Sequence, residues 1–590
     1  MEQIFSNTTY SINQLIEMID SGDLGLPELQ RPFIWKDAKV RDLFDSLMKG
    51  YPVGYLMLWD CPTFDKKRTI GEAENKEPKT VIIDGQQRLT SLYAVITGKK
   101  VKDENYQERN IIISYNPLIN KFEVGYQATK NDKEWIYNIS ELFCSHNFTF
   151  ISKFINVLEE SRNSKGLVLS DEEKTIIADN IQEVVALTKQ KLSVVSIKAN
   201  VEEEDVSEIF VRVNSGGISL KQNDFILTLL SLYWDEGRTF IESFCRESLT
   251  PSKETTAFNQ ITSVSAQDVI RTVMAYAFNR ARLKYGYKLL RGADFDKKGA
   301  IDLELRDERF AVLKAKLPDV LNVHYWHEYL KCIKNAGYLS GDLISSGTTI
   351  FYNYALYLIA KDRFDASYND NMLLTSQFFY YSSLVSLFTG SFESTMEGIL
   401  NSVNECQTFD DYKNLIHAKI KESLTDDFFK ITLCGSNYLA VSGKGNPSWY
   451  AYCAALNILK SGVLFSKASM ITSQLYEIGT DGNRKSLEKH HLFPKKYLKS
   501  LGYSDSRINQ MANYAYIDWK DNMEILDEAP SVYYPIICQG RTAEEIEKME
   551  SENALPHGWE NMSYEDFLIE RRKLMAAKIK EGFDFLIKQI

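Results

Sequence analysis

Hydrophobic residues recur with a helical period through the first hundred residues, and short apolar runs interrupt that pattern. Ser11 and Gln14 form a capping box ahead of the first periodic segment, so a helix should begin there. The apolar runs predict short buried strands. The expected elements after the first helix are a helix over 37–50, a strand over 55–59, a strand over 81–83, a turn at 84–85 and a helix ending at Gly98.

The pattern changes twice further along the chain. Residues 209–213 predict another strand and 214–217 a turn, but beyond these the strand signals fade and long amphipathic stretches predict helices. The C-terminal part combines turns, two short strand-like segments and a closing helix that Ser563 and Asp566 cap. Its apolar face should carry Phe567, Leu568, Leu574, Met575, Ile579 and Phe583. We therefore expect an α+β multidomain chain with domains at 1–234, 235–430 (α-helical) and 431–590.

Length and composition narrow the class of protein. A chain of 590 residues exceeds what one hydrophobic core supports, and 44% hydrophobic with 25% charged residues is typical of a folded globular chain. No apolar run is long enough to span a membrane, and the first residues lack a signal peptide, so we expect a cytoplasmic protein. The eight cysteines include no C-x-x-C pair, which favours buried thiols over disulfides or a cysteine zinc site.

The charge distribution is uneven. A net charge of −11 argues against a protein that coats nucleic acid by overall attraction. One stretch, 484–499, nevertheless carries six basic side chains and one acidic side chain. Nucleic acid, if bound, should contact this stretch, and Lys489, Lys495 and Lys496 are its candidate DNA contacts.

The stretch also contains two adjacent histidines, His490 and His491, in a chain with only seven. Adjacent side chains on a strand point to opposite faces, so both serve one site only where the strand ends, and Pro494 supplies a turn. Such a pair suits a hydrolytic site in which one imidazole holds a metal and the other activates water. The alternative is two exposed polar residues in a basic loop.

The string HHLFP, followed by Asn513 and Asn522, resembles the HNH or ββα-metal nuclease motif. The resemblance implies that His490 ligates a divalent metal, Mg²⁺ or Mn²⁺, and that His491 is the general base. It implies further that Asn513 steadies the loop that carries the base and that Asn522 is a second metal ligand. This sequence has no carboxylate at the usual ligand positions, although Asp518 and Asp521 lie nearby.

A second candidate site follows the buried strand 81–83. The string DGQQR places a turn and a helix N-terminus there, where free backbone N–H groups and the helix dipole favour an anion. Gln86, Gln87 and Arg88 add amide and guanidinium donors. In the alternative interpretation Asp84 caps the helix and Arg88 forms a surface ion pair.

The strings LPELQRPFIW, DGQQRLTSL and FVRVNSGGISL resemble, in that order, the ParB/sulfiredoxin-like domain of GmrSD-type restriction proteins. That family pairs the domain, which binds and often hydrolyses a nucleoside triphosphate, with an HNH-type nuclease domain. The resemblance spans roughly 5–230 and 430–590. It implies nucleotide contacts at Asp84, Gly85, Gln86, Gln87 and Arg88, with Gln30, Arg31, Arg212 and Asn214 as further candidates.

These features together predict a cytoplasmic antiphage nuclease in which a nucleotide-responsive domain regulates a metal-dependent DNA endonuclease or nickase. Foreign, modified DNA is the expected substrate. Two other functions stay open: a nucleotide-switched DNA-binding protein with an inactive nuclease domain, and an RNA-cleaving toxin. The sequence also leaves open which nucleotide binds and whether the chain forms homo-oligomers.

Overall fold

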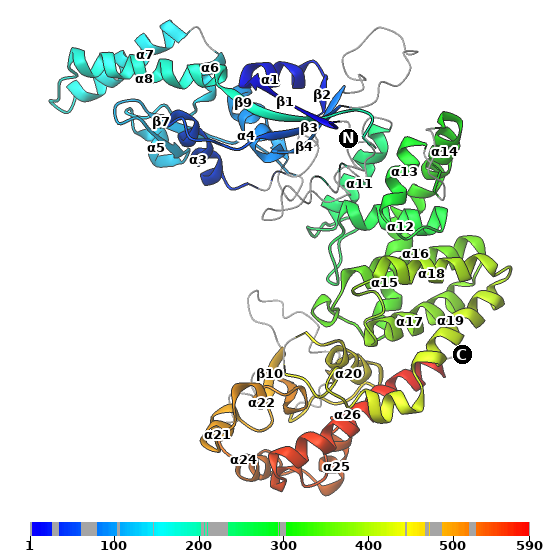
Figure 1. Cartoon of the computed structure of the whole chain (residues 1–590). Coiled ribbons are helices and arrows are strands. Elements are labelled where there is room, and N and C mark those ends of the chain that lie inside the picture. The colour runs from blue at the N-terminus through cyan, green and yellow to red at the C-terminus, as the bar shows by residue number, and fades with distance from the viewer. Residues whose placement is uncertain are drawn as a thin grey trace. The chain divides into compact units, whose positions relative to one another are not determined.

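The structure is a computed structural model that describes most of the chain, in two compact units, Met1–Glu242 and Ser243–Ile590 (Figure 1). Each unit is described by itself. The described residues are 3–25, 33, 35–60, 79–102, 107–144, 147–201, 206, 209, 230, 234–292, 294–295, 302–442, 445–466, 471–472, 487–518 and 527–588.

The first unit is built on a mixed five-stranded sheet in the order β1-β9-β3-β4-β2. Its strands are β1 (Phe5–Ser11), β2 (Leu24–Gly25), β3 (Leu56–Asp60), β4 (Thr80–Asp84) and β9 (Lys191–Ile197). The β1–β9 and β3–β4 pairs are antiparallel, whereas β9–β3 and β4–β2 are parallel. The sheet thus brings β4, which leads into the DGQQR segment, beside β3.

Several helices share one hydrophobic core with this sheet, among them α1 (Ile12–Asp20), α3 (Asp37–Met48) and α4 (Gln86–Thr97). The predicted capping box is confirmed, because the Ser11 side chain accepts from the Gln14 backbone and the Gln14 side chain accepts from the Ser11 backbone. The remaining elements of the unit are β5 (Val101–Lys102), β6 (Glu108–Arg109), β7 (Ile113–Asn116), β8 (Lys121–Val124), α5 (Gln127–Asn131), α6 (Ser140–Cys144), α7 (Asn147–Asn163) and α8 (Asp171–Ala186).

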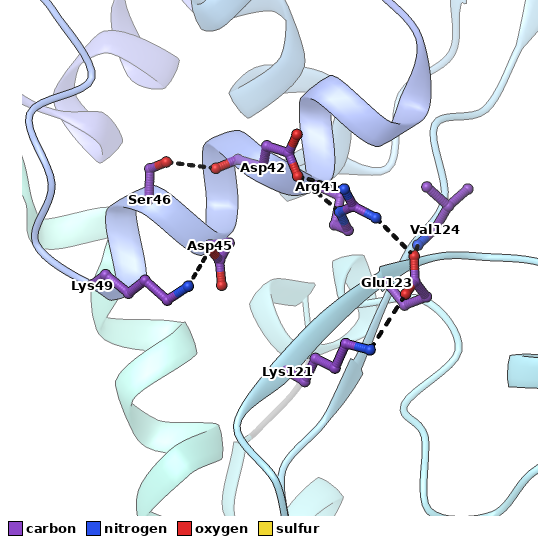
Figure 2. A network of polar contacts seen from close by, with 8 residues as sticks. All are labelled: Arg41, Asp42, Asp45, Ser46, Lys49, Lys121, Glu123 and Val124. Atoms are coloured by element: carbon purple, nitrogen blue, oxygen red, sulfur yellow. Dashed lines mark hydrogen bonds and ion pairs between the residues drawn. The ribbon is translucent and has the colours of Figure 1, made fainter.

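A polar network joins α3 to the small hairpin formed by β7 and β8. Figure 2 shows Arg41 of α3 donating to Glu123 of β8 at 3.0 Å and pairing with Asp42 at 2.6 Å. These hydrogen bonds raise the pKa of the Arg41 guanidinium. Lys121 approaches the same Glu123 carboxylate. Since the pairs are partly exposed, they should contribute to the orientation of α3 more than to stability.

The second unit begins with helices, as the amphipathic pattern predicts. Between 248 and 427 the described residues form helices, turns and loops without a strand (Figure 1). The helices are α11 (Asp235–Glu247, which crosses the unit boundary), α12 (Ala266–Phe278), α13 (Lys284–Arg291), α14 (Leu303–Val320), α15 (Val323–Asn335), α16 (Gly347–Arg363), α17 (Tyr368–Leu384), α18 (Phe392–Glu405) and α19 (Phe409–Ser423).

The C-terminal part of the unit combines helices with a two-stranded hairpin. Its elements are α20 (Pro447–Ile458), β10 (Leu487–His491), α21 (Lys495–Ser500), α22 (Asp505–Ile508), β11 (Tyr514–Asp518), α24 (Pro530–Ile537), α25 (Ala543–Glu552) and α26 (Tyr564–Ile587). The closing helix α26 packs on both α17 and α20, and Tyr380 of α17 donates to the carbonyls of Ala451 and Ile579. The boundary predicted between 430 and 431 therefore lies inside one packed unit.

Several local predictions can be compared with these elements. The strand predicted from Ile209 is wrong at that residue, which is helical, and 210–229 lie outside the described residues. On α26 the predicted Ser563 cap is confirmed, but Leu574 is exposed rather than part of the buried face. Among the described cysteines, four are buried as predicted, whereas Cys434 and Cys538 are partly exposed. No helix in the described ranges combines the length and apolarity needed to cross a bilayer.

Candidate active site

The two adjacent histidines lie at the end of β10, which pairs with β11 in an antiparallel hairpin. His490 is opposite Ala515, and His491, the last residue of the strand, is opposite Tyr514. Residues 492–494 then leave the strand, and Pro494 stands at the N-cap of α21. The strand therefore ends where the sequence predicted a turn.

Asn513 connects the two sides of this hairpin from inside the core. Its side chain is fully buried, and its Oδ1 accepts a hydrogen bond from the Phe493 backbone at 2.8 Å. Its Nδ2 donates to the carbonyl oxygens of Phe493 and Ile508 at 3.1 and 3.0 Å. In addition, the Leu492 amide donates to the Asn513 carbonyl at 2.8 Å. Asn513 thus has the contacts of a residue that holds the loop after His491.

His491 lies in a partly buried, polar environment. Its Nε2 is 3.1 Å from Oδ1 of Asn509, and its ring packs against Tyr514 at a centroid distance of 4.6 Å. Burial lowers the pKa of the imidazole, the Asn509 hydrogen bond raises it, and the nearby Lys495 lowers it. The ring is therefore biased toward the neutral form, which is the form able to accept a proton.

The side chain of His490 has different neighbours from that of His491. Its buried ring contacts Phe465 and Tyr533 at centroid distances of 6.3 and 6.2 Å. The other predicted ligand, Asn522, lies outside the described residues with Asp521, and nothing is described of the Asp518 side chain. Among the residues that the structure describes, no group of three or more His, Cys, Asp or Glu side chains could hold a metal ion. A buried imidazole suits a divalent metal chemically, but His490 alone does not make a metal site.

Two of the three lysines predicted to contact DNA, Lys495 and Lys496, begin α21, immediately after the histidine loop. Lys495 and Lys499 both pair with Asp505, at 3.1 and 3.3 Å, and Lys496 pairs with Asp527 at 3.3 Å. All three side chains are about half exposed or more. The positive charge seen in the sequence is thus partly neutralised by acidic side chains from later segments. Of Lys489 only the backbone, in β10, is described.

Side chains of the closing helix α26 contact the segment 507–513, which precedes β11. The Tyr564 hydroxyl donates to the carbonyls of Arg507 and Ile508 at 2.9 and 3.1 Å, and Arg572 donates to the Gln510 side chain at 3.0 Å. Arg571 is fully buried and donates to the Ala512 carbonyl at 3.2 Å, and burial lowers the pKa of its guanidinium. Three side chains of one helix therefore hold the segment 507–513.

The DGQQR segment forms the junction between β4 and α4 in the first unit. Gly85 is the N-cap of α4 with φ of +87°, so Asp84 is not the cap that the alternative interpretation assigned. The buried Gln86 donates to the Ile82 carbonyl at 3.2 Å. Gln87 accepts from the Trp35 backbone at 3.1 Å. Trp35 belongs to the LPELQRPFIW string, so the fold brings two of the three strings together.

Arg88 binds the backbone that precedes β3. Its Nη1 donates to the Val53 carbonyl at 2.6 Å and its Nη2 to the Tyr55 carbonyl at 2.9 Å, whereas Asp84 is 3.5 Å away. Burial lowers the pKa of the guanidinium. Arg88 is thus mainly a ligand of backbone carbonyls in this structure. The further nucleotide candidates Gln30, Arg31, Arg212 and Asn214 lie outside the described residues.

Comparison with known proteins identifies the type of domain in the first unit. Residues 12–231 match the family model described as the N-terminal domain of the GmrSD restriction endonuclease. The first unit carries a GmrSD N-terminal domain. The resemblance of this part of the sequence is thereby confirmed, and the family indicates a restriction-type defence nuclease that acts on DNA. The match ends before the second unit and does not bear on the HNH resemblance.

A relative extends the similarity beyond the GmrSD N-terminal domain. The uncharacterized protein MJ0686 of Methanocaldococcus jannaschii is 22% identical over 570 residues, which cover 90% of this chain and 87% of that protein. An alignment of that extent includes parts of both units. The sequence similarity between the two proteins therefore extends over both units.

Sequence reasoning missed the residues that hold the predicted ones in place. Asn509 and Tyr514 contact His491, and the backbone of Val53 and Tyr55 contacts Arg88. Asn509 lies four residues before Asn513, but no motif in the sequence marks it. Backbone carbonyls carry no sequence signal at all.

The Arg88 contacts predict that Gly54 of the GmrSD N-terminal domain cannot be replaced without displacing the guanidinium. A Cβ at Gly54 would lie 2.4 Å from Arg88 Nη1, and the residue has φ of +85°. Gly50 has φ of +69° with nothing within 4 Å of its Cβ position, so it is a matched control. Gly50→Ala should cost about 1–2 kcal/mol for the left-handed backbone alone.

Gly54→Ala should cost about 1 kcal/mol more than Gly50→Ala, because it also disturbs a hydrogen bond of Arg88. Denaturant titration of the full chain would measure the free energy of unfolding of both variants. Equal losses for the two variants would show that the contact between Arg88 and the 53–55 backbone contributes nothing measurable.

Proposed function

We propose that this chain is a nucleotide-regulated, metal-dependent DNA endonuclease or nickase of antiphage defence that acts on modified foreign DNA. One observation carries the proposal: a GmrSD N-terminal domain shares the chain with a hairpin whose strand ends at His491, supported by the buried Asn513. The histidine supplies a base, and the asparagine fixes the loop that follows it.

In the proposed reaction, His491 takes a proton from a water molecule as the water oxygen attacks the scissile phosphorus. The bond from phosphorus to the 3′-oxygen breaks in line with the attack, which leaves 5′-phosphate ends. The partial burial that lowers the pKa of His491 and biases it toward the neutral imidazole favours this role. Asn513 keeps the loop after the base from moving during the reaction.

His490 and Asn522 would hold the divalent metal, Mg²⁺ or Mn²⁺, whose chemistry is to stabilise negative charge on the phosphate and on the leaving oxygen. The DNA backbone would follow α21, where Lys495 and Lys496 are exposed next to the histidine loop. A nucleoside triphosphate would bind the DGQQR segment of the first unit and control cleavage.

Replacement of the proposed base should abolish cleavage. His491→Ala should reduce the rate of plasmid nicking about 10²- to 10⁴-fold, the usual contribution of a positioned general base. The reaction should also stop in EDTA. His557→Ala is the matched control, because this exposed histidine of the same unit pairs with Glu550 of α25 at 3.5 Å and is not part of the hairpin.

Nicking by His491→Ala at the wild-type rate would remove this histidine from the mechanism. DNA binding without any cleavage by the wild type, with metal and each nucleotide supplied, would instead favour a DNA-binding protein with an inactive nuclease domain. Cleavage of RNA in preference to DNA would favour a toxin.

Nucleotide and DNA should affect each other's binding. A coupling between two binding sites is reciprocal, so cognate DNA should change nucleotide affinity measured by calorimetry. Arg88→Ala should reduce nucleotide affinity and change DNA cleavage, because it releases the backbone of 53–55 beside the DGQQR segment. Lys99→Ala, which removes an exposed ion pair to Asp20 in the same unit, is the control. A nucleotide affinity that DNA leaves unchanged, together with wild-type cleavage by Arg88→Ala, would mean that the two units act independently.

The ion pairs of α21 predict opposite effects on DNA affinity from two sets of variants. Replacing Lys495 and Lys496 with alanine should weaken binding and lower the slope of log affinity against log salt by about 0.9 for each lost phosphate contact. Asp505→Asn should strengthen binding, because it releases Lys495 and Lys499 from a competing carboxylate. Lys573→Ala, which removes an exposed pair with Glu570 on α26, should change neither quantity.

Fluorescence anisotropy with labelled duplex across a salt series would measure the affinities. An unchanged slope in the lysine double variant would place the DNA elsewhere on the protein.

A further inference from the structure

Asn509 is placed to control which nitrogen of His491 carries the proton. The residue caps the C-terminus of the short helix α22, and its Oδ1 lies 3.1 Å from His491 Nε2. The same oxygen accepts a hydrogen bond from the Tyr514 hydroxyl at 3.0 Å. Tyr514 is also the strand partner of His491 and packs against its ring. The three side chains therefore form one closed cluster.

The chemistry of this cluster determines the direction of the hydrogen bonds. A carbonyl oxygen only accepts, and it has two lone pairs, which Tyr514 O–H and His491 Nε2–H can occupy together. A neutral imidazole carries one hydrogen, so a hydrogen on Nε2 leaves the lone pair on Nδ1. Nδ1 is then the nitrogen that can accept a proton.

We propose that Asn509 is a positioning residue that sets the tautomer and ring orientation of His491, with Tyr514 holding the Asn509 amide. The catalytic consequence rests on the proposed function, since it makes Nδ1 the atom that takes the proton from the attacking water. As the oxygen–phosphorus bond forms and the bond to the 3′-oxygen breaks, that proton moves to Nδ1. It passes to solvent after the product leaves, and the released 3′-oxygen takes a proton from water to become a hydroxyl.

The surrounding structure keeps Asn509 in place. The carbonyls of the two preceding residues, Arg507 and Ile508, accept hydrogen bonds from Tyr564 of α26. The backbone N–H of Asn509 donates to the Asp505 carbonyl at 3.0 Å, and the Ile508 carbonyl also accepts from the side chain of the buried Asn513. The segment that presents Asn509 is thus fixed by two independent side chains. In sites with an activated nucleophile, a third group commonly orients the base through its second nitrogen.

Nitrogen chemical shifts test the tautomer directly and do not depend on cleavage. The full-length chain, labelled with ¹⁵N only at histidine, would be examined at a pH where the imidazole is neutral, and His491→Gln would assign the signal. We expect a pyrrole-type shift at Nε2 and a pyridine-type shift at Nδ1. The reverse assignment, or an equal mixture of the two tautomers, would overturn the proposal.

Three variants add kinetic evidence. Asn509→Leu removes the acceptor, so it should mix the tautomers and lower kcat for nicking about 10- to 100-fold, the usual loss for a group that orients another, with little change in KM. Asn509→Asp keeps an oxygen acceptor, so, unlike Asn509→Leu, it should retain the Nε2–H tautomer and much of the wild-type kcat. Tyr514→Phe keeps the ring contact but loses one hydrogen bond to Asn509, so its effect should be intermediate.

Gln510→Leu is the matched control on the same segment. Gln510 donates to the Ser506 carbonyl and accepts from Arg572, and neither contact reaches the imidazole. If Asn509 acted only by stiffening the segment, Gln510→Leu would lower kcat equally, and no variant would change the tautomer signal. That pattern would overturn the proposal, whereas an Nε2–H tautomer in a protein that cleaves nothing would refute only the nuclease function.

Discussion

The buried side chain of Asn513 is the constraint on which the candidate active site depends. It makes three hydrogen bonds to the backbone on both sides of the hairpin, at Phe493 and Ile508. These backbone groups leave water on folding, and each would cost about 1–3 kcal/mol if left without a partner. An amide is suited to the position because it donates and accepts at the same end of a short side chain. Without it, the loop after His491 would lose the side chain that holds it, and the segment carrying Asn509 would keep only the contacts from Tyr564 of the two side chains that fix it.

The helix α26, which supports this arrangement, carries a buried arginine whose desolvation costs free energy. Arg571 is fully buried, and among the described residues it has no carboxylate partner. Taking a guanidinium out of water costs several kcal/mol after relaxation, so its hydrogen bond to the Ala512 carbonyl and other contacts of the fold must offset that cost. The other contacts include the packing of Phe493, Phe567 and Trp559, whose rings lie within 4.8 to 6.0 Å of one another. The aromatic cluster places α26 against the hairpin, and its polar side chains then reach the 507–513 backbone.

The features that sequence could predict are those decided by neighbours in the chain. The Ser11 capping box, the strand before Asp84 and the Ser563 cap depend on residues within four positions, and all three are confirmed. Leu574 fits the period of the closing helix but is exposed, because periodicity indicates a face without saying how wide the covering element is. The Asn509 and Arg88 contacts depend on folding that brings together residues 18 and 35 positions apart. No local pattern contains that information.

The same distinction changes the interpretation of the DGQQR segment. From sequence, Arg88 is the natural phosphate ligand, since a guanidinium can bind an anion through two nitrogens. In the structure those nitrogens donate to the Val53 and Tyr55 carbonyls, and a phosphate would have to displace them. The first turn of α4 differs in that its N-cap, Gly85, has no side chain to occupy the backbone N–H groups of the turn, although a Cβ at Gly85 would clash with Leu56. In the proposed nucleotide site, the backbone amides of this turn would therefore be the primary anion donors. Arg88 would act mainly by holding the 53–55 backbone beside them, which makes that backbone the part of the first unit most directly able to respond to a bound nucleotide.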